Sequence, residues 1–440
     1  MNVGIIGSGG REHAICKSIK KSPKVNKIYC FPGNAGTSEH AENVEIGISD
    51  FNKIKEFSLS NKINLIIVGP EKPLVDGIVD FFKNTKISIF GPDKISSQLE
   101  GSKIFTKKIC ESYKIPTAKF GIFESSSEAI TFLDKTPFPL VIKADGLASG
   151  KGVYICENKD EGNIAIKEIF NGKFGIAKNV LLEEFLVGEE MSYFIISDGK
   201  EIKNFETAQD HKRVLENDKG SNTGGMGAYS PSRLINKKLE QKILTKIIKP
   251  TIKALKKMGS NYRGFLYVGL MIVNEEPFLI EYNVRMGDPE CQTILPKLKT
   301  DLLEIIEACC DRNLKNLKIE WFDQKSLCVV LCSKGYPDEY NRNILIENLD
   351  KLNLDEGDFV FHAGTKKNNN KIYSNGGRVI NFVSLSSSFK GSRNKIFNHI
   401  NKLNWSGGFF RKDIGYKVID EGELYQVTSK VKKFYSLKTN

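Results

Sequence analysis

The sequence lacks a long hydrophobic run. No stretch of its 440 residues reaches the roughly 18 consecutive apolar residues that a membrane-spanning helix requires. The N-terminal residues 1–6 are followed at once by Gly7-Ser8-Gly9-Gly10-Arg11, which ends the segment before the core of a signal peptide can form. We therefore expect a protein of the cytoplasm that has no membrane partner.

Paired cysteines and clustered histidines are also lacking. The nine cysteines are odd in number, are scattered and form no Cys-x-x-Cys motif. The five histidines show no metal-ligand spacing. The sequence therefore predicts neither a disulfide framework nor a zinc site, and it is compatible with a reducing compartment.

Positive charge is abundant but is not concentrated in a binding module. The formal net charge is +12, yet the lysines are spread along the whole chain. The densest basic stretch, residues 237–257, has apolar residues at helical spacing between its lysines, which predicts an amphipathic helix with a solvated face. We therefore expect no nucleic-acid partner. The two low-complexity patches, residues 366–371 and 384–388, are predicted to be loops.

The length predicts about three domains. In the first hundred residues, short apolar strands alternate with amphipathic helices, and Gly or Pro turns follow the strands. This alternation is typical of a parallel, doubly wound sheet. Strand-rich segments follow, and another set of strands begins beyond about residue 317. The predicted fold class is thus multidomain, with α/β and α+β parts.

The first glycine loop, residues 7–12, follows a strand and opens a helix, where backbone amides can hold a phosphate. It does not fit a dinucleotide fingerprint, because Glu12 stands where the third glycine is needed. The second strand also ends in Phe31-Pro32-Gly33-Asn34 instead of an acid for the ribose hydroxyls. A sugar phosphate at Gly10 and Arg11 is the favoured interpretation, and a purely structural turn is the alternative.

Two further turns support a ligand at this edge of the sheet. Residues 33–37 follow the second strand, and residues 69–71 follow the third. Ligands of open parallel sheets bind at the carboxyl ends of the strands. We therefore expect the three turns to share one ligand.

The second glycine loop, residues 142–153, is not a Walker motif. Only three residues separate Gly146 from Gly150, Gly152 follows Lys151, and a strand comes next instead of a helix. The loop is therefore predicted to join two antiparallel strands. Such a hairpin can fold over ATP, with its glycines allowing close approach and Lys143 and Lys151 supplying charge, although a plain surface hairpin is the alternative.

Oxygen ligands and an arginine share one face of a later strand. Glu281 and Asn283 alternate onto the same side, and Arg285 is two residues further on. Earlier, residues 183–190 end an apolar strand whose backbone could bind an adenine edge, while an acidic strand exit without function is the alternative. Together with the glycine hairpin, these features indicate magnesium-assisted phosphoryl transfer.

At this point the chain closely resembles the phosphoribosylamine-glycine ligase family of the ATP-grasp superfamily. The resemblance runs the full length and rests on twelve ordered motifs. They are IGSGGREHA (6–14), PGNAGT (32–37), VGPE (68–71), QLEGSK (98–103), IKADGLASGKGV (142–153), QDHKR (209–213), NTGGMGAYSP (222–231), GFLYVGLM (264–271), EYNVRMGDPE (281–290), FHAGTK (361–366), NGGRV (375–379) and RKDIG (411–415).

The resemblance implies a reaction and a domain order. ATP, glycine and 5-phosphoribosylamine would give glycinamide ribonucleotide, ADP and phosphate through glycyl phosphate, with Mg²⁺ as the metal and Mn²⁺ as the alternative. Residues 1–101 would form the doubly wound N-terminal domain. Residues 102–316 would form the ATP-grasp domain, with a lid at about 116–190, and residues 317–440 a mixed C-terminal domain. A monomer is expected.

The resemblance also implies site residues. Arg285 and Lys143 would be catalytic, and Glu281 and Asn283 would hold the metal. ATP would be bound by Lys103, Lys143, Gly150, Lys151, Gly152, Glu183, Glu184, Phe185, Leu186 and Glu190. The other substrates would be bound by Gly10, Arg11, Asn34, Gly36, Thr37, Pro70, Glu71, Asp210, Arg213, Gly225 and Asp288.

Four positions depart from the family pattern. Leu215 and Ser221 replace the usual Gly and Pro, which puts the rigidity of that loop in doubt, while Met286 and Cys291 replace the usual Phe and Thr. The volume at Met286 and Cys291 is roughly kept, so we expect altered affinity instead of lost activity. We interpret Cys291 as an inert buried residue, because no histidine lies near it in sequence.

Three alternatives stay open. Another ATP-grasp carboxylate-amine ligase or a carboxylase would share the metal and nucleotide residues but not the N-terminal turns. A nicotinamide-dependent dehydrogenase is disfavoured by Glu12. An RNA-binding protein would rely on positive charge alone and would show steeply salt-dependent binding.

Overall fold

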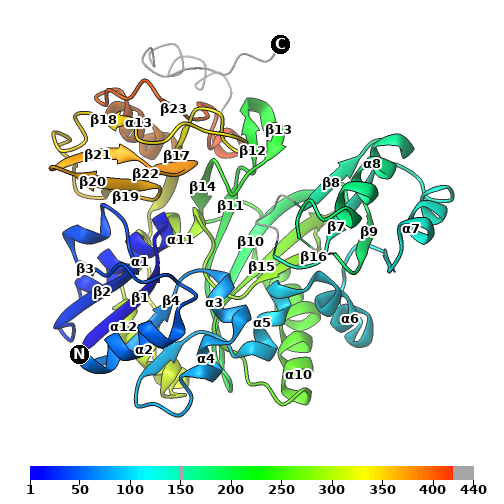
Figure 1. Ribbon diagram of the computed structural model, residues 1–440, viewed down its shortest axis with the longest axis horizontal. Helices are drawn as coiled ribbons and strands as arrows, with labels where there is room; N and C mark the ends of the chain where they lie inside the picture. The colour runs from blue at the N-terminus through cyan, green and yellow to red at the C-terminus, as the bar shows by residue number, and fades with distance from the viewer. Residues whose placement is uncertain (148–151, 176, 420–440) are drawn as a thin grey trace.

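The computed structural model describes residues 1–147, 152–175 and 177–419. Within these ranges, no helix is both long and apolar enough to cross a membrane. The chain builds an N-terminal parallel sheet, a small antiparallel lid sheet and one long sheet that continues into the C-terminal part (Figure 1). The predicted fold class, with α/β and α+β parts, is confirmed.

The N-terminal sheet has parallel strands in the order β3 (Glu42–Asn43), β2 (Lys27–Pro32), β1 (Asn2–Gly7), β4 (Ile63–Val68) and β5 (Ser88–Phe90). Its central strands are apolar and buried, as expected for a parallel sheet covered by helices. Since β1 pairs with both β2 and β4, the turns after these three strands meet at one edge. The predicted doubly wound arrangement therefore brings the three turns together.

Helices connect these strands and lead into the central part. They are α1 (Gly10–Lys20), α2 (Phe51–Ser60), α3 (Glu71–Asp76), α4 (Ile78–Phe81), α5 (Lys94–Gly101) and α6 (Lys103–Tyr113). Asp93 caps α5 by accepting from the Ser96 N–H, and Ser102 caps α6 by accepting from the Phe105 N–H. Only Ser102 separates α5 from α6, so the end of one helix and the start of the next form a sharp corner.

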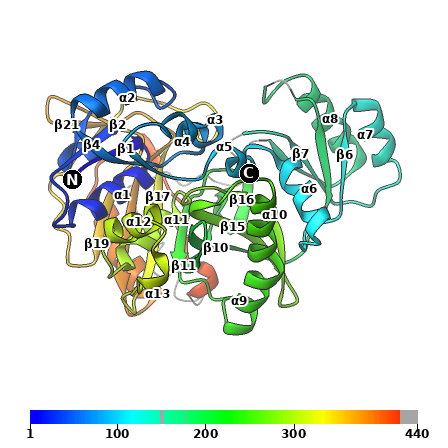
Figure 2. The same ribbon diagram turned by 90° about the horizontal axis from the view of Figure 1, so that it is seen from below.

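The segment predicted as the lid, a name we keep for it, folds as an antiparallel sheet with strands in the order β6 (Phe120–Phe123), β9 (Val180–Glu184), β7 (Leu140–Ala144) and β8 (Val153–Cys156), and it carries α7 (Ser126–Leu133) and α8 (Lys159–Phe170). The antiparallel pairing of β7 with β8 confirms the predicted glycine hairpin. Leu133, Ile142 and Ile166 belong to an apolar core of the lid alone. The lid stands to one side of the main body in both views (Figure 1 and Figure 2).

The long sheet crosses the whole main body. Its strands run in the order β16 (Glu276–Asn283), β15 (Arg263–Val273), β10 (Glu189–Asp198), β11 (Ile202–Asp210), β14 (Gly227–Ser230), β17 (Lys325–Ser333), β22 (Arg378–Ser386) and β19 (Asp358–His362), and β23 (Gly408–Phe409) pairs with β17. The pairing of β14 with β17 joins the central and C-terminal parts in one hydrogen-bonded ladder.

The remaining elements flank this sheet. The helix predicted at residues 237–257 is confirmed as α9 (Lys237–Ile243) and α10 (Lys249–Lys257), joined by a π-helical turn, Leu244–Ile248. The other elements are α11 (Glu290–Ile294), α12 (Leu302–Cys310), α13 (Phe389–Ile400), the hairpin β12 (Arg213–Leu215) and β13 (Lys219–Asn222), and the sheet β18 (Leu345–Ile346), β21 (Lys371–Ser374) and β20 (Thr365–Asn368).

The prediction that residues 366–371 and 384–388 form loops was wrong in part. Lys366 and Lys367 belong to β20, which turns at Asn369-Asn370 into β21. Both asparagines have positive φ, the conformation that a tight hairpin turn requires. The first three residues of the serine patch end β22, because pairing with β17 overrides the local preference of serine for loops.

Candidate active site

Two lysines surround one buried glutamate where the lid sheet meets α6. Glu183, near the end of β9, places Oε2 2.7 Å from Lys143 Nζ on β7 and Oε1 2.9 Å from Lys107 Nζ on α6. Burial raises the pKa of the Glu183 carboxyl, but the two lysines outweigh this effect and lower the pKa overall. Glu183 is therefore an ionised carboxylate that holds two cations at the mouth of the hairpin.

Lys103 lies at the start of α6, one turn before Lys107. Its Nζ donates a 2.9 Å hydrogen bond to the Gly146 carbonyl oxygen in the glycine hairpin. The Ser102 hydroxyl and the Ile104 N–H both donate to the Asp145 carboxylate, so the root of the hairpin is tied to the N-terminus of α6. Lys107 was missing from the predicted site, although its spacing of four from Lys103 places both on one helix face.

The hairpin glycines are only partly described. The Gly152 carbonyl oxygen accepts a 2.8 Å hydrogen bond from the Ala144 N–H, which closes the hairpin above β7 and β8. Gly150 and Lys151, predicted to bind ATP, lie outside the described residues. The described part of the hairpin therefore places only its stem against α6.

One face of β16 carries the predicted metal ligands. Glu281, Asn283 and Arg285 are partly accessible, whereas Tyr282 and Val284 between them are buried. The alternation puts the carboxylate, the amide and the guanidinium on the same side, as predicted. Burial raises the pKa of Glu281, but Lys212, Lys143 and Lys103 lower it further, so the carboxyl is ionised and surrounded by cations.

Lys212 is a site residue that the sequence analysis missed. It lies beside Glu190 at the start of β10, with 2.6 Å between Lys212 Nζ and Glu190 Oε2. Burial lowers the pKa of Lys212, but Glu190 and Asp210 raise it well above its usual value. Lys212 lies in the two-residue link between β11 and β12, so no strand pattern marks it, and its place in the QDHKR motif is the signal that could have identified it. The predicted Arg213 begins β12, and its guanidinium instead donates to the Gly220 carbonyl oxygen on β13 of the same hairpin.

Arg285 connects β16 to the N-terminal region. Its Nη2 lies 2.6 Å from Glu100 Oε1, and its Nε lies 3.4 Å from Glu71 Oε2. Glu71 is the first residue of α3, and Pro70 precedes it as the N-cap. The structure therefore brings the predicted Glu71 to Arg285 and adds Glu100 as a second carboxylate.

The segment between β9 and β10 links the lid to the long sheet. Glu184 Oε1 accepts a 2.9 Å hydrogen bond from the Lys119 N–H, while Phe185 and Leu186 are partly accessible. A short exposed link follows and leads to Glu190 on β10. The residues predicted to bind adenine and ribose thus lie between the lysines that pair with Glu183, Lys107 and Lys143, and Lys212.

Asn34 organises the turn after β2. Its Oδ1 accepts hydrogen bonds from the backbone N–H groups of Gly36 and Thr37, and its Nδ2 donates to the Ser8 and His362 carbonyl oxygens. Thr37 is fully buried, and a Cβ at Gly36 would overlap the His13 ring. Asn34 therefore joins three segments, while Gly36 and Thr37 support it from behind.

Glu12 occupies the space inside the first glycine loop. Its Oε2 accepts a 2.6 Å hydrogen bond from the Gly9 N–H, and its Oε1 lies 2.6 Å from Arg11 Nε. A Cβ at Gly69 would overlap the same carboxylate. The position that a third glycine would leave open for a pyrophosphate is thus filled by a side chain. Gly10 and Arg11 are buried behind the loop.

A pocket of about 920 Å³ opens between the N-terminal turns and the C-terminal part. Asn34 and Asp288, both predicted to bind substrate, line it, and the wall adds basic side chains that the prediction missed. FHAGTK and NGGRV, which carry two of these side chains, were recognised as motifs but were given no role. The basic side chains of the wall are Lys366, Lys367 and Arg378.

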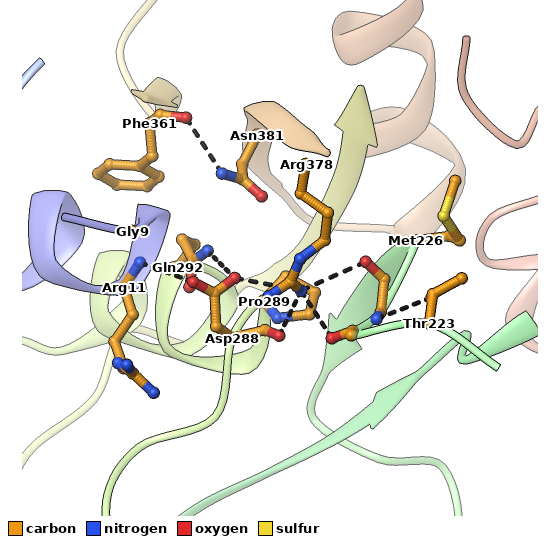
Figure 3. Close-up of polar contacts among 12 residues, drawn as sticks. Gly9, Arg11, Thr223, Met226, Asp288, Pro289, Gln292, Phe361, Arg378 and Asn381 are labelled. Atoms are coloured by element: carbon orange, nitrogen blue, oxygen red, sulfur yellow. Dashed lines mark hydrogen bonds and ion pairs between the residues drawn. The ribbon is translucent and has the colours of Figure 1, made fainter. Parts of the chain in front are cut away.

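Arg378 is the centre of a polar junction beside this pocket (Figure 3). Its Nη1 donates 2.6 Å hydrogen bonds to the carbonyl oxygens of Gly224 and Asp288, and it also reaches Gly225 O at 3.4 Å. The Asp288 carboxylate lies 3.3 Å from the guanidinium and accepts from the Gln292 side chain and the Arg11 N–H. One arginine thereby joins the loops of the central part to the C-terminal part.

The departures from the family pattern fall in ordered structure. Leu215 and Ser221 lie on opposite strands of the β12–β13 hairpin, which Arg411 fastens through an ion pair of 2.8 Å to Asp218. Met286 is buried, and its carbonyl oxygen accepts from Arg11. Cys291 is fully buried, and burial raises the pKa of its thiol, in agreement with an inert residue.

Comparison with known proteins gives one consistent result. Family models of phosphoribosylglycinamide synthetase match the chain in order: the N domain over residues 1–100, the ATP-grasp (A) domain over residues 101–291 and the C domain over residues 326–417. A phosphoribosylamine–glycine ligase from Caldanaerobacter subterraneus is 48% identical over 418 residues, which cover 94% of this chain and 99% of the relative. One from Mesorhizobium japonicum is 43% identical over 420 residues, covering 95% and 99%.

Solved structures agree. The crystal structure of phosphoribosylamine–glycine ligase from Thermotoga maritima has a TM-score of 0.82 and 32% identity, covering 94% of this chain and 100% of that chain. A biotin carboxylase from Campylobacter jejuni has a TM-score of 0.69 at 15% identity and covers 92% of each chain, which shows likeness of fold alone. The predicted ATP-grasp fold is confirmed.

Proposed function

The chain belongs to the phosphoribosylamine–glycine ligase family, and from this membership we propose how its site joins glycine to 5-phosphoribosylamine. ATP drives the ligation, which belongs to purine biosynthesis. We infer two steps. A glycine carboxylate oxygen attacks the γ-phosphorus and ADP leaves. The substrate amine then attacks the carbonyl carbon of glycyl phosphate, loses a proton and expels phosphate, giving glycinamide ribonucleotide.

The observation that carries this proposal is the placement of opposite charges side by side. Glu281 and Asn283 share one face of β16, Arg285 follows the strand on the same side, and Lys103 and Lys143 add positive charge beside Glu281. Phosphoryl transfer requires this combination of charge neutralisation and positioning, with little covalent chemistry by the protein. Arg285 steadies the charge that develops on the transferring phosphoryl group.

The residues present fit a magnesium ion. Mg²⁺ prefers oxygen donors and commonly takes one or two protein ligands together with substrate phosphates. Glu281 offers an ionised carboxylate because the surrounding lysines lower its pKa, and Asn283 offers an amide oxygen on the same face. The ion would neutralise phosphate charge, and Mn²⁺, with similar oxygen preference, would serve as well.

The nucleotide binds between the lid and the long sheet. We propose that Lys103 and Lys143 bind its phosphates, that residues 183–186 bind the adenine and that Glu190 binds the ribose. Lys143 and Lys107 pair with Glu183, and Lys103 lies one turn before Lys107, which supports the proposal because phosphate oxygens can take the place of a carboxylate as partners. Gly150, Lys151 and Gly152 would cover the phosphates from the hairpin.

The phosphate end of 5-phosphoribosylamine fits the 920 Å³ pocket. Lys366, Lys367 and Arg378 give its wall three positive charges, and Asn34 and Asp288 provide polar groups toward the ribose. The pocket lies between the N-terminal turns and the C-terminal part, so both would contact the substrate. Gly36, Thr37, Gly10 and Arg11 support the wall from behind.

A substrate comparison tests the proposal. Purified protein should release ADP and form an amide only when ATP, Mg²⁺, glycine and 5-phosphoribosylamine are all present. The controls replace glycine by alanine or by bicarbonate. Turnover with a replacement but not with glycine would favour another ATP-grasp ligase or a carboxylase.

Cytoplasmic location and a monomeric state remain part of the proposal. The nine cysteines are all free, which is typical of a reducing compartment. The large exposed apolar side chains, such as Leu59, Ile164 and Val187, lie on separate elements. Size-exclusion chromatography with light scattering should give a mass near 49.4 kDa.

A further inference from the structure

Glu100 is a buried carboxylate near the end of α5 to which the sequence analysis gave no role. Its Oε1 lies 2.6 Å from Arg285 Nη2, and its Oε2 accepts a 2.8 Å hydrogen bond from the Val284 N–H. The side chain is only 7% exposed. A single carboxylate therefore holds both the guanidinium of Arg285 and the backbone directly before it.

This location is electrostatically unfavourable for an acid. Glu100 lies in the last turn of α5, where the helix dipole already presents partial negative charge. Burial raises the pKa of Glu100, Arg285 lowers it and Glu71 raises it again, which leaves a pKa of about 7. A buried acid in such a place costs stability, and local conflicts of this kind mark functional positions.

Glu100 fixes the point where the chain leaves β16. The strand ends at Asn283, so the Val284 N–H is the first donor beyond it. The direction of the chain at this point decides how Asn283 and Arg285 face the site. On the other side, only Gly101 and Ser102 separate Glu100 from Lys103 on α6.

We propose that Glu100 is a positioning residue that fixes Arg285 and the exit of β16 against the corner between α5 and α6. The arginine, the predicted metal ligands and the phosphate-binding Lys103 thereby keep the spacing that phosphoryl transfer requires. Glu100 acts through Arg285 and does not touch the substrates. The inference rests on the proposed function, because the role of Arg285 does.

The test separates catalysis from stability. Glu100→Gln keeps an acceptor for the Val284 N–H but removes the charge that orients Arg285. We expect kcat to fall about 10- to 100-fold while the melting temperature stays equal or rises, because a buried acid is lost. Glu111→Gln is the matched control, an exposed carboxylate in the last turn of α6. It should keep wild-type kcat.

A double-mutant cycle shows whether Glu100 acts through Arg285. In an Arg285→Ala background, Glu100→Gln should change kcat by less than about twofold, because the group it positions is absent. Glu100→Asp keeps the charge on a shorter stem and should recover part of the loss.

Defined outcomes overturn the inference. Wild-type kcat in Glu100→Gln would do so, as would equal losses in both backgrounds or a fall of kcat that follows a fall in melting temperature. Failure of the proposed function would instead show as no ligation by the wild type. In that case, hydrogen exchange at the Val284 amide still reports on positioning, and unchanged protection in Glu100→Ala would refute it.

Discussion

At the residue scale, the ions of the site form opposite-charge pairs. Glu183 lies buried between Lys107 and Lys143, and the more exposed Lys212 lies beside Glu190. Around Glu183 each partner offsets the desolvation of the other, so charged groups persist in a region with little water. Lysines that are already held in place need little reorganisation when phosphates arrive.

Glu281→Ala tests the metal face. Removing the carboxylate should lower kcat/KM at least about a thousandfold, equal to roughly 4 kcal/mol of transition-state stabilisation, with the fold intact because β16 stays paired with β15. Steady-state kinetics and circular dichroism measure the two effects. Glu275→Ala, in the exposed turn of the same hairpin, is the control. Near-normal activity of Glu281→Ala would refute the assigned role.

Lys212→Met tests the residue that sequence reasoning missed. Lys212 pairs with Glu190, the proposed ribose ligand, at 2.6 Å, so its loss should leave that carboxylate without its charged partner and weaken the apparent affinity for ATP about 10- to 100-fold. Titration of activity with ATP measures the change. Lys219→Met, on the exposed strand β13, should leave the affinity unchanged. Equal affinity in both variants would contradict the prediction.

At the element scale, the β12–β13 hairpin depends on a distant segment. Arg411 is almost fully buried and pairs with both Asp218 in the hairpin and Asp413 beside it. Tyr416 also donates a 2.7 Å hydrogen bond to Asp218. These contacts order a hairpin in which the usual glycine and proline are replaced.

Arg411→Met should loosen this hairpin. The two carboxylates would lose their buried partner, so we expect a loss of about 2 kcal/mol in the free energy of unfolding, with faster proteolysis within the hairpin. Urea unfolding and limited proteolysis measure these effects. Lys402→Met, an exposed substitution in the same C-terminal part, should change neither.

Local pattern and distant partners explain what the sequence could and could not predict. The alternation of apolar strands with helices predicted the N-terminal sheet. The alternation of side chains between the two faces of a strand predicted the shared face of Glu281, Asn283 and Arg285. Both patterns follow from residue spacing alone. Glu100 and Lys366 were missed, because Arg285, the partner of Glu100, and Asn34, which lines the same pocket as Lys366, lie elsewhere in the chain. No local pattern shows that Glu100 meets Arg285, 185 residues away.

At the scale of the whole molecule, buried histidines join the N-terminal and C-terminal parts. His13 on α1 accepts a 2.9 Å hydrogen bond at Nδ1 from the His362 N–H on β19. Burial lowers the pKa of both imidazoles, that of His362 to about 4. Both rings are therefore neutral at physiological pH, because burial at this interface disfavours their protonated, charged form.

The histidines predict a loss of stability in mild acid. In the unfolded chain both rings titrate near pH 6.5, so between about pH 6.5 and 4 the unfolded chain binds protons that the folded chain does not. Stability therefore falls as pH falls, by up to ~1.4 kcal/mol per pH unit for each ring. Urea unfolding at several pH values measures the slope. His362→Gln should reduce it by one ring, and an unchanged slope would contradict the assignment.

The ladder between β14 and β17 also determines how the chain can be divided. A cut between α12 and β17 would leave each fragment with an open strand edge, and such edges invite pairing with foreign strands. The fragments made separately should aggregate. When they are produced together, the two fragments should associate and restore ligation, because β14 in one fragment pairs with β17 in the other. The C-terminal part can therefore be exchanged between relatives only together with β14, the strand that pairs with its β17.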